Sequence, residues 1–163
     1  MNYIKNIGEK SLKAFEKLKN VEHSKIKRAL KEYASLVKKN KFKILRENSK
    51  DIKKAKRKKL IDRLILNSAK INQIVSSIKT IEKFKNPVGQ VLSKWKRSSK
   101  LKIEKVSIPI GVICVIYESR PNVTADVASL CLKSGNSVIL RGGSEAYYTC
   151  LLYTSPSPRD MWT

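Results

Sequence analysis

The sequence predicts an α/β fold in which N-terminal helices pack on an incomplete parallel β-sheet. Two observations favour this class. Apolar residues recur at helical spacing through most of residues 3–85, whereas 110–117 (IGVICVIY) and 137–140 (SVIL) are continuous apolar runs rich in β-branched residues. Such runs are typical of parallel strands buried on both faces. One helical segment separates them, so residues 109–146 are expected to form a βαβ unit.

The helical region ends where the composition changes at Asn86-Pro87-Val88-Gly89, because proline cannot continue a helix and glycine accepts turn dihedrals. Ser24 is the expected N-cap of the second helix, and Asn67 or Ser68 that of the last one. The basic run at 53–59 is interpreted as a solvated helix end. The apolar spacing predicts helices over residues 3–19, 24–40 and 68–85, and a third helix from 42 that ends in the basic run 53–59. A short apolar turn is expected at 61–66.

Residues 91–108 are expected to form a β-ribbon, because segments 91–95 and 101–108 flank the turn sequence KRSSK and the second shows an imperfect period of two. In the βαβ unit, Asn122 or Thr124 is expected to open the helix, and Gly135 suits the left-handed position that ends it. The expected inner face of this helix consists of Val123, Val127, Leu130 and Cys131.

The net charge of +23 lies entirely in the first 105 residues, which hold 32 basic and 9 acidic side chains, whereas residues 106–163 are neutral. One interpretation is a nucleic-acid footprint, in which clustered cations displace counterions from phosphates. The other is a solvated surface in a lysine-rich protein. Lysines outnumber arginines 27 to 5 in this region, and this bias favours the second interpretation, because phosphate and base recognition favour the arginine fork.

Several classes of protein are not expected. No apolar run approaches the ~20 residues that span a bilayer, and MNYIKNIGEK shows no secretory signal pattern. The three cysteines have no metal-ligand spacing, and no second histidine joins His23, which is interpreted as a surface residue. Neither a disulfide framework nor a metal site is expected, and a reducing cytoplasm is the default location. Cys114 and Cys131 are interpreted as small core hydrophobes.

The carboxyl ends of the two predicted strands place polar side chains at one sheet edge, where ligands of open α/β sheets bind. Arg141 runs from the second strand directly into Gly142-Gly143-Ser144. The glycines allow a ligand to approach the backbone, Arg141 offers a fork to a phosphate and Ser144 adds a hydroxyl. The alternative is an ordinary loop with an exposed arginine. The fingerprint GxGxxG is absent, so a standard Rossmann phosphate loop is not predicted.

The segment after the first strand, Tyr117 to Asn122, faces this loop. Asn122 stands at the mouth of a helix, where an amide caps the helix or donates to an oxyanion; its position alone favours the cap. Glu118 is open to interpretation as a base, a ribose ligand or a solvated carboxylate.

Three stretches resemble gamma-glutamyl phosphate reductase, a family of the aldehyde dehydrogenase superfamily. They are IDRLILNSAKI (61–71), NPVGQV (86–91) and PIGVICVIYESRPNVTADVASLCLKSGNSVILRGGSEA (109–146). The resemblance covers about residues 7–146. It implies an incomplete Rossmann-like sheet of the aldehyde dehydrogenase type and a partial NADP-binding domain over 1–146. The implied reaction, in proline biosynthesis, reduces L-glutamyl 5-phosphate with NADPH to L-glutamate 5-semialdehyde through a cysteine thioester.

The resemblance also implies roles for single residues. Arg141, Gly142, Gly143 and Ser144 match the loop that contacts the adenosine ribose and its phosphate, and a serine at 144 leaves room for the 2′-phosphate of NADP(H). Tyr117 and Glu118 on the facing segment are counted with the cofactor-binding residues. Asn122 matches the superfamily asparagine that stabilises the oxyanion, so the family match favours catalysis over a cap.

Two departures from the family stand out. The family's nucleophilic cysteine lies far downstream of VILRGG, so the chain is interpreted as an N-terminal fragment, inactive alone, of a cytoplasmic homo-oligomer that acts with glutamate 5-kinase. Residues 147–163 do not match and contain Ser-Pro-Ser-Pro, so they are expected to be a non-native or disordered tail. The alternative function is a small basic nucleic-acid-binding module.

Overall fold

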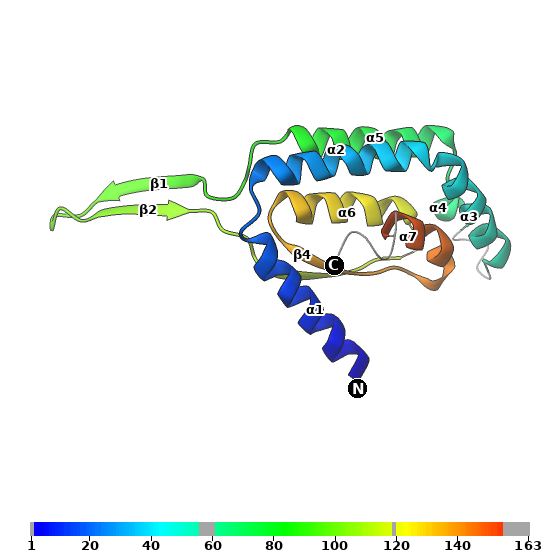
Figure 1. Cartoon of the computed structure of the whole chain (residues 1–163), viewed down its shortest axis with the longest axis horizontal. Helices are drawn as coiled ribbons and strands as arrows, with labels where there is room; N and C mark the ends of the chain where they lie inside the picture. The colour runs from blue at the N-terminus through cyan, green and yellow to red at the C-terminus, as the bar shows by residue number, and fades with distance from the viewer. Residues whose placement is uncertain (1, 56–60, 119, 155–163) are drawn as a thin grey trace.

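The computed structural model describes residues 2–55, 61–118 and 120–154. These residues form a helix-rich α/β structure with two separate two-stranded sheets (Figure 1). In chain order the elements are α1 (Asn2–Leu18), α2 (His23–Lys39), α3 (Lys41–Lys54), α4 (Ile61–Leu64), α5 (Ser68–Lys83), β1 (Val91–Lys96), β2 (Lys102–Val106), β3 (Val112–Ile116), α6 (Pro121–Lys133), β4 (Ser137–Arg141), the 3-10 turn η2 (Ser144–Ala146) and α7 (Tyr147–Thr154).

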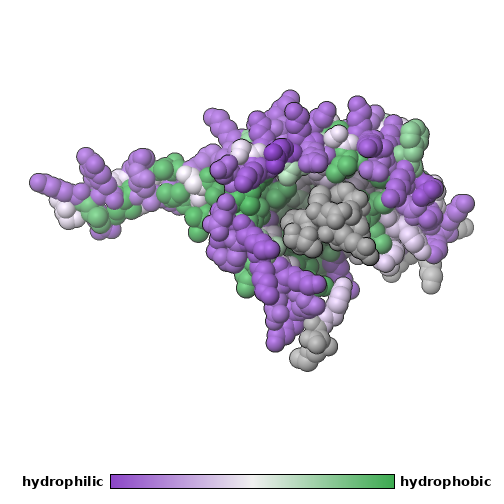
Figure 2. Space-filling model, viewed as in Figure 1, coloured by the Kyte–Doolittle hydropathy of each residue, from purple (hydrophilic) through white to green (hydrophobic). Residues whose placement is uncertain are grey.

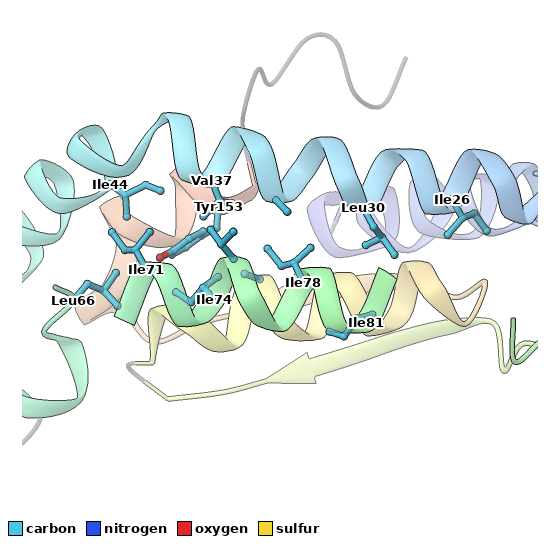
Figure 3. Close-up of a cluster of buried hydrophobic side chains, with 13 residues drawn as sticks. Ile26, Leu30, Val37, Ile44, Leu66, Ile71, Ile74, Ile78, Ile81 and Tyr153 are labelled. Carbon is cyan, nitrogen blue, oxygen red and sulfur yellow. The ribbon is translucent and has the colours of Figure 1, made fainter. Parts of the chain in front are cut away.

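The core lies mainly between α2 and α5, which run side by side and present their apolar stripes to each other (Figure 3). Leu30, Ile71 and Ile78 are completely buried there. Each such side chain contributes about 1.5–3 kcal/mol through removal of its apolar surface from water. The helix α5 begins as the sequence predicts, because the Asn67 side chain accepts a hydrogen bond of 2.8 Å from the Lys70 amide.

The helix α6 packs between this helical pair and the sheet of β3 and β4, so the layers follow the order helices, helix, sheet (Figure 1). The strands β3 and β4 are parallel, with Val112 opposite Ser137 and Ile116 opposite Arg141. The predicted strand–helix–strand unit is therefore confirmed. Gly135 has a φ of 70°, which is the left-handed conformation that the sequence predicts after α6.

The antiparallel ribbon of β1 and β2 projects away from the rest of the molecule (Figure 1). Its register pairs Trp95 with Ile103, and Lys94 forms an ion pair of 2.6 Å with Glu104. The ribbon starts after Gly89, whose φ of 77° makes the predicted turn.

Several local expectations are wrong. The N-cap of α2 is Glu22 rather than Ser24, because the helix begins at His23, two residues earlier than a cap at Ser24 would place it. On α6, Leu130 is 48% exposed, and the buried positions include the polar Thr124, Ser129 and Lys133. Hydrogen bonds stabilise these buried polar side chains, whereas the sequence predicts an inner face of apolar side chains.

The strands are also less buried than predicted. A two-stranded sheet leaves edges and part of its faces open, and Ile116 is 75% exposed. Cys114 on β3 is exposed rather than in the core, while Cys131 is buried as expected. His23 is half-buried rather than on the surface, and its Nε2 lies 3.3 Å from the buried Lys133 Nζ.

The expectation of a disordered tail over 147–163 is wrong for residues 147–154. Residues 147–154 form α7, which packs on α3 and α6, and Thr149 is completely buried. The reason is a polar contact: both Asp51 carboxylate oxygens accept hydrogen bonds from the α7 backbone, at 3.0 Å from the Tyr148 amide and 2.8 Å from the Thr149 amide. Residues 155–163, with Ser-Pro-Ser-Pro, lie outside the described residues, as do 56–60 of the basic run.

Candidate functional site

The candidate site is built from the two segments that follow β3 and β4. Because the strands are parallel and in register, both segments leave the sheet at the same edge. The first begins with Tyr117 and Glu118, and the second consists of Arg141, Gly142, Gly143 and Ser144. The structure therefore places the two predicted groups of site residues beside each other.

Arg141 is the last residue of β4 and is exposed. Its carbonyl oxygen accepts a hydrogen bond of 3.0 Å from the Tyr117 amide, which extends the strand pairing by one residue. Among the described residues no carboxylate forms an ion pair with its guanidinium. Its five donors are thus available to an anion at the sheet edge.

The loop after Arg141 turns without a left-handed residue. Neither Gly142 nor Gly143 has a positive φ angle. Gly143, at φ −65° and ψ 151°, is the N-cap of η2. Ser144 is exposed, and its hydroxyl donates a long hydrogen bond of 3.4 Å to Glu145. The loop therefore presents one cation and one hydroxyl, with a carboxylate next to the hydroxyl.

Tyr117, which the sequence counts among the cofactor-binding residues, places its ring between Gly142 and α6. Its ring turns inward, and its hydroxyl lies 2.6 Å from the hydroxyl of the completely buried Thr124 on α6. Burial raises the pKa of Tyr117 to about 12, so the side chain is neutral. Cys150 lies near the same group, 3.4 Å from the Thr124 hydroxyl.

Glu118 is exposed and accepts a hydrogen bond of 2.6 Å from Arg63 of α4. This ion pair links the segment after β3 to the helical layer. The contact makes Glu118 a structural partner of Arg63. Of the three interpretations that the sequence leaves open, it does not favour Glu118 as a catalytic base.

Asn122 lies within the first turn of α6 and is exposed. The interpretation as a helix cap is wrong, because the helix begins at Pro121, its N-cap is Arg120, and no side chain makes the cap hydrogen bond. The Asn122 amide forms no hydrogen bond to other residues within the described part of the chain. It is thus free to donate to a group near the positive end of the helix.

Thr124 and Arg63 are the two contributors to this region that sequence reasoning missed. Arg63 contacts Glu118 across 55 residues of the chain, whereas Thr124 contacts Tyr117 across the turn between β3 and α6. No local pattern carries such a signal, and Thr124 in particular resembles any other helix-start residue.

Comparison with known proteins decides the relationship. The chain is 43% identical over 151 residues to a gamma-glutamyl phosphate reductase from Carboxydothermus hydrogenoformans, which covers 90% of this chain. It is 42% identical over 147 residues to the enzyme of that name from a Sulfurihydrogenibium species. This chain is homologous to the gamma-glutamyl phosphate reductases. It spans about a third of the length of these relatives, 36% and 33% respectively. No family model matches the chain.

Solved structures agree with this result. A gamma-glutamyl phosphate reductase from Thermotoga maritima superimposes with a TM-score of 0.84 at 38% identity, over 90% of this chain and 36% of that one. The reductase from Saccharomyces cerevisiae gives 0.82 at 30% identity, over 88% and 38%. An acetylating aldehyde dehydrogenase from Geobacillus thermoglucosidasius, at 12% identity and a TM-score of 0.58 over 93% and 32%, shows the shared fold alone.

These gamma-glutamyl phosphate reductase relatives do not favour the alternative of a nucleic-acid-binding module. The described residues contain no cluster of three metal-ligating side chains, and none of their helices is long and apolar enough to cross a membrane.

Proposed function

We propose that this chain forms the nucleotide-binding part of an NADPH-dependent gamma-glutamyl phosphate reductase. The enzyme would reduce L-glutamyl 5-phosphate to L-glutamate 5-semialdehyde, in proline biosynthesis. The observation that carries the proposal is the position of Arg141-Gly142-Gly143-Ser144 at the carboxyl end of a parallel strand, in a chain homologous to these reductases.

The residues of the loop fit the phosphorylated ribose of NADP(H). The exposed Arg141 guanidinium matches the charge and geometry of a phosphate. Ser144 offers a hydroxyl where a carboxylate would repel a 2′-phosphate, although Glu145 follows it and its carboxylate lies 3.4 Å from that hydroxyl. When bound, the nicotinamide supplies the hydride, and the task of this chain is to hold the nucleotide at the sheet edge.

Asn122 is the proposed oxyanion donor. The oxygen of an acyl group gains negative charge as a nucleophile adds to its carbon, and a fixed amide donor stabilises that charge. Asn122 suits this task because its amide is exposed at the N-terminal turn of α6, where the helix dipole favours negative charge.

The nucleophilic cysteine of the proposed reaction lies outside this chain. Burial raises the thiol pKa values of Cys131 and Cys150, which opposes formation of a reactive thiolate. Cys114 is exposed in the middle of β3, away from the segments that end the strands. We therefore expect this chain alone to bind nucleotide without catalysing the reduction.

The proposal extends to the surroundings of the enzyme. An acyl phosphate hydrolyses readily in water, so a kinase that makes it, glutamate 5-kinase, would act beside the reductase. We place the enzyme in the cytoplasm, because the three cysteines form no disulfide among the described residues, as expected in a reducing compartment. We further propose that the enzyme is a homo-oligomer.

The test of this function compares nucleotides that differ only in the 2′-phosphate. Binding of adenosine 2′,5′-bisphosphate and of adenosine 5′-monophosphate is measured by calorimetry on the chain and on Arg141→Ala. A charge-assisted hydrogen bond is worth about 1.5–3 kcal/mol, so the variant should bind the bisphosphate about ten- to a hundred-fold more weakly. Its affinity for the monophosphate should change much less.

Arg97→Ala is the matched control, because Arg97 is an exposed arginine at the ribbon turn. It removes the same charge from the molecule without touching the sheet edge. Equal losses for both nucleotides, or equal losses in the two variants, would contradict the role of Arg141.

A further inference from the structure

We propose that Tyr117 is a positioning residue that fixes the Arg141–Gly142 backbone, and that glycine is required at position 142 by the Tyr117 ring rather than by the nucleotide. This inference rests on the proposed function for its consequence in nucleotide binding, but the contact that it describes stands on geometry alone.

Tyr117 contacts two consecutive residues of the loop, Arg141 with its backbone amide and Gly142 with its ring. Its amide donates to the Arg141 carbonyl oxygen at 3.0 Å. Its ring lies against Gly142, so that a Cβ built on Gly142 would meet the Tyr117 hydroxyl oxygen at 3.1 Å and two ring carbons at 3.2 Å. One residue thus supports both the backbone that carries the Arg141 guanidinium and the turn that follows it.

The ring cannot easily move away from an added methyl group. Its hydroxyl lies 2.6 Å from the hydroxyl of Thr124, which is completely buried on α6. The far end of the ring is therefore held by a hydrogen bond to a rigid helix. A methyl group at 142 would displace either this hydrogen bond or the loop.

The backbone conformation does not explain the glycine. Gly89, Gly111 and Gly135 have positive φ angles, whereas Gly142 does not. Alanine could therefore adopt the conformation at 142 without strain. The remaining constraint is the space that the Tyr117 ring occupies. The glycine at 142 is thus explained by contact with this ring, without the general argument that a glycine lets a ligand approach the backbone.

A double-mutant cycle tests the inference on the full chain. Gly142→Ala is made in the wild type and in Tyr117→Ala, and binding of adenosine 2′,5′-bisphosphate is measured for all four proteins. We expect Gly142→Ala to weaken binding about tenfold in the wild type and less than about twofold in Tyr117→Ala, where the obstructing ring is gone. Gly8→Ala is the control, because a Cβ at Gly8 has nothing within 4 Å.

The preference for the 2′-phosphate separates positioning from a general loss of structure. Tyr117→Ala keeps the backbone amide that donates to the Arg141 carbonyl oxygen but removes the ring that supports Gly142 beside it, so it should reduce the affinity ratio of the bisphosphate to adenosine 5′-monophosphate. Tyr117→Phe keeps the ring and should retain most of that ratio. An unchanged ratio in Tyr117→Ala would overturn the positioning role. Equal losses from Gly142→Ala in both backgrounds would show that the ligand itself requires the glycine.

Failure of the proposed function would give a different pattern. If the wild type binds no bisphosphate, the cycle is measured instead on thermal unfolding and on hydrogen exchange of the Tyr117 amide. Coupling between the two substitutions, with faster exchange in Gly142→Ala than in the wild type, supports the contact. Additive effects with unchanged exchange overturn it.

Discussion

Asn48 on α3 joins three segments of the chain through its side-chain amide. Its Nδ2 donates to the Leu64 carbonyl oxygen at 2.9 Å and to the Thr149 hydroxyl at 3.2 Å, and its Oδ1 accepts from the Leu66 amide at 2.9 Å. Asn48 is 1% exposed, so water cannot replace it as the hydrogen-bond partner of these groups. A single side chain therefore satisfies backbone groups of the α4–α5 connection and holds α7.

Replacing Asn48 by alanine should lower the free energy of unfolding by about 2–4 kcal/mol, because it leaves buried donors and acceptors without partners. Urea unfolding followed by circular dichroism measures the change. Ser49→Ala is the control, since within the described part of the chain the exposed Ser49 side chain bonds only to the Leu45 carbonyl of its own helix, and this substitution should shift stability by less than about 0.5 kcal/mol. Equal effects of the two variants would contradict the role of Asn48.

At the scale of elements, the start of α2 and the end of α6 meet at His23 and Lys133. The Lys133 ammonium is almost completely buried and donates to the Glu82 carbonyl oxygen of α5 at 2.8 Å. Glu82 in turn pairs with Lys27 at 3.6 Å. Burial, followed by the charges of Lys133 and Lys27, lowers the pKa of His23. Three helices thus converge on a group that the fold keeps neutral.

This arrangement predicts a loss of stability on acidification. The folded chain holds the His23 proton less tightly than the unfolded chain, whose histidine pKa is about 6.5. The contribution of neutral His23 to the free energy of unfolding is complete above pH 6.5. It is lost as the pH falls from 6.5 towards the lower pKa of His23 in the folded chain. Denaturant unfolding between pH 7.5 and 5.5 should show a steeper decline for the wild type than for His23→Gln. His23 is the chain's only histidine, and parallel declines would contradict the assignment.

The elements differ in how far the sequence predicts them. The stripe Ile71, Ile74 and Ile78 repeats with the helical period, so α5 follows from local spacing and from the Asn67 cap. The strands β3 and β4 follow from their β-branched runs, but their exposure does not, because it depends on how many strands the sheet contains. The position of α7 depends on Asp51, almost 100 residues away, and no local pattern reveals that contact.

The candidate site divides in the same way. Arg141 and the glycines that follow it were predictable, because polar residues after a buried strand lie at the binding edge of a parallel sheet. The direction of the Tyr117 side chain was not predictable, since it depends on Thr124 of the next helix. The sequence thus predicts which residues meet at the edge, but not which of them face a ligand and which support the backbone.

At the scale of the whole molecule, the positive charge and the site are separated. Hydrophilic side chains cover the visible surfaces of the helices and the ribbon, with apolar side chains between them (Figure 2). The neutral second part of the chain contains β3, α6, β4 and the site loop. The overall charge of +23 would attract anionic ligands over a distance without choosing among them.

The exposed apolar side chains near the β3–β4 sheet predict self-association. Ile110 is 84% exposed and Ile116 is 75% exposed, and apolar groups beside an open sheet edge favour pairing between chains. The double substitution Ile110→Thr/Ile116→Thr should reduce the mass measured by light scattering. Phe42→Thr is the control, because Phe42 is 83% exposed on α3, outside the sheet. An unchanged mass in the double variant would show that this surface does not drive association.

NADP(H) is proposed to bind at the edge formed by the ends of β3 and β4. The most direct measurement is a titration of the isotope-labelled chain with NADP⁺, followed by amide chemical shifts in NMR spectra. We expect the largest shifts at residues 141–144 and 117–122, with saturation that survives physiological salt. Shifts scattered over the lysines of the helices and the ribbon and abolished by salt, or no shifts at the sheet edge, would contradict it.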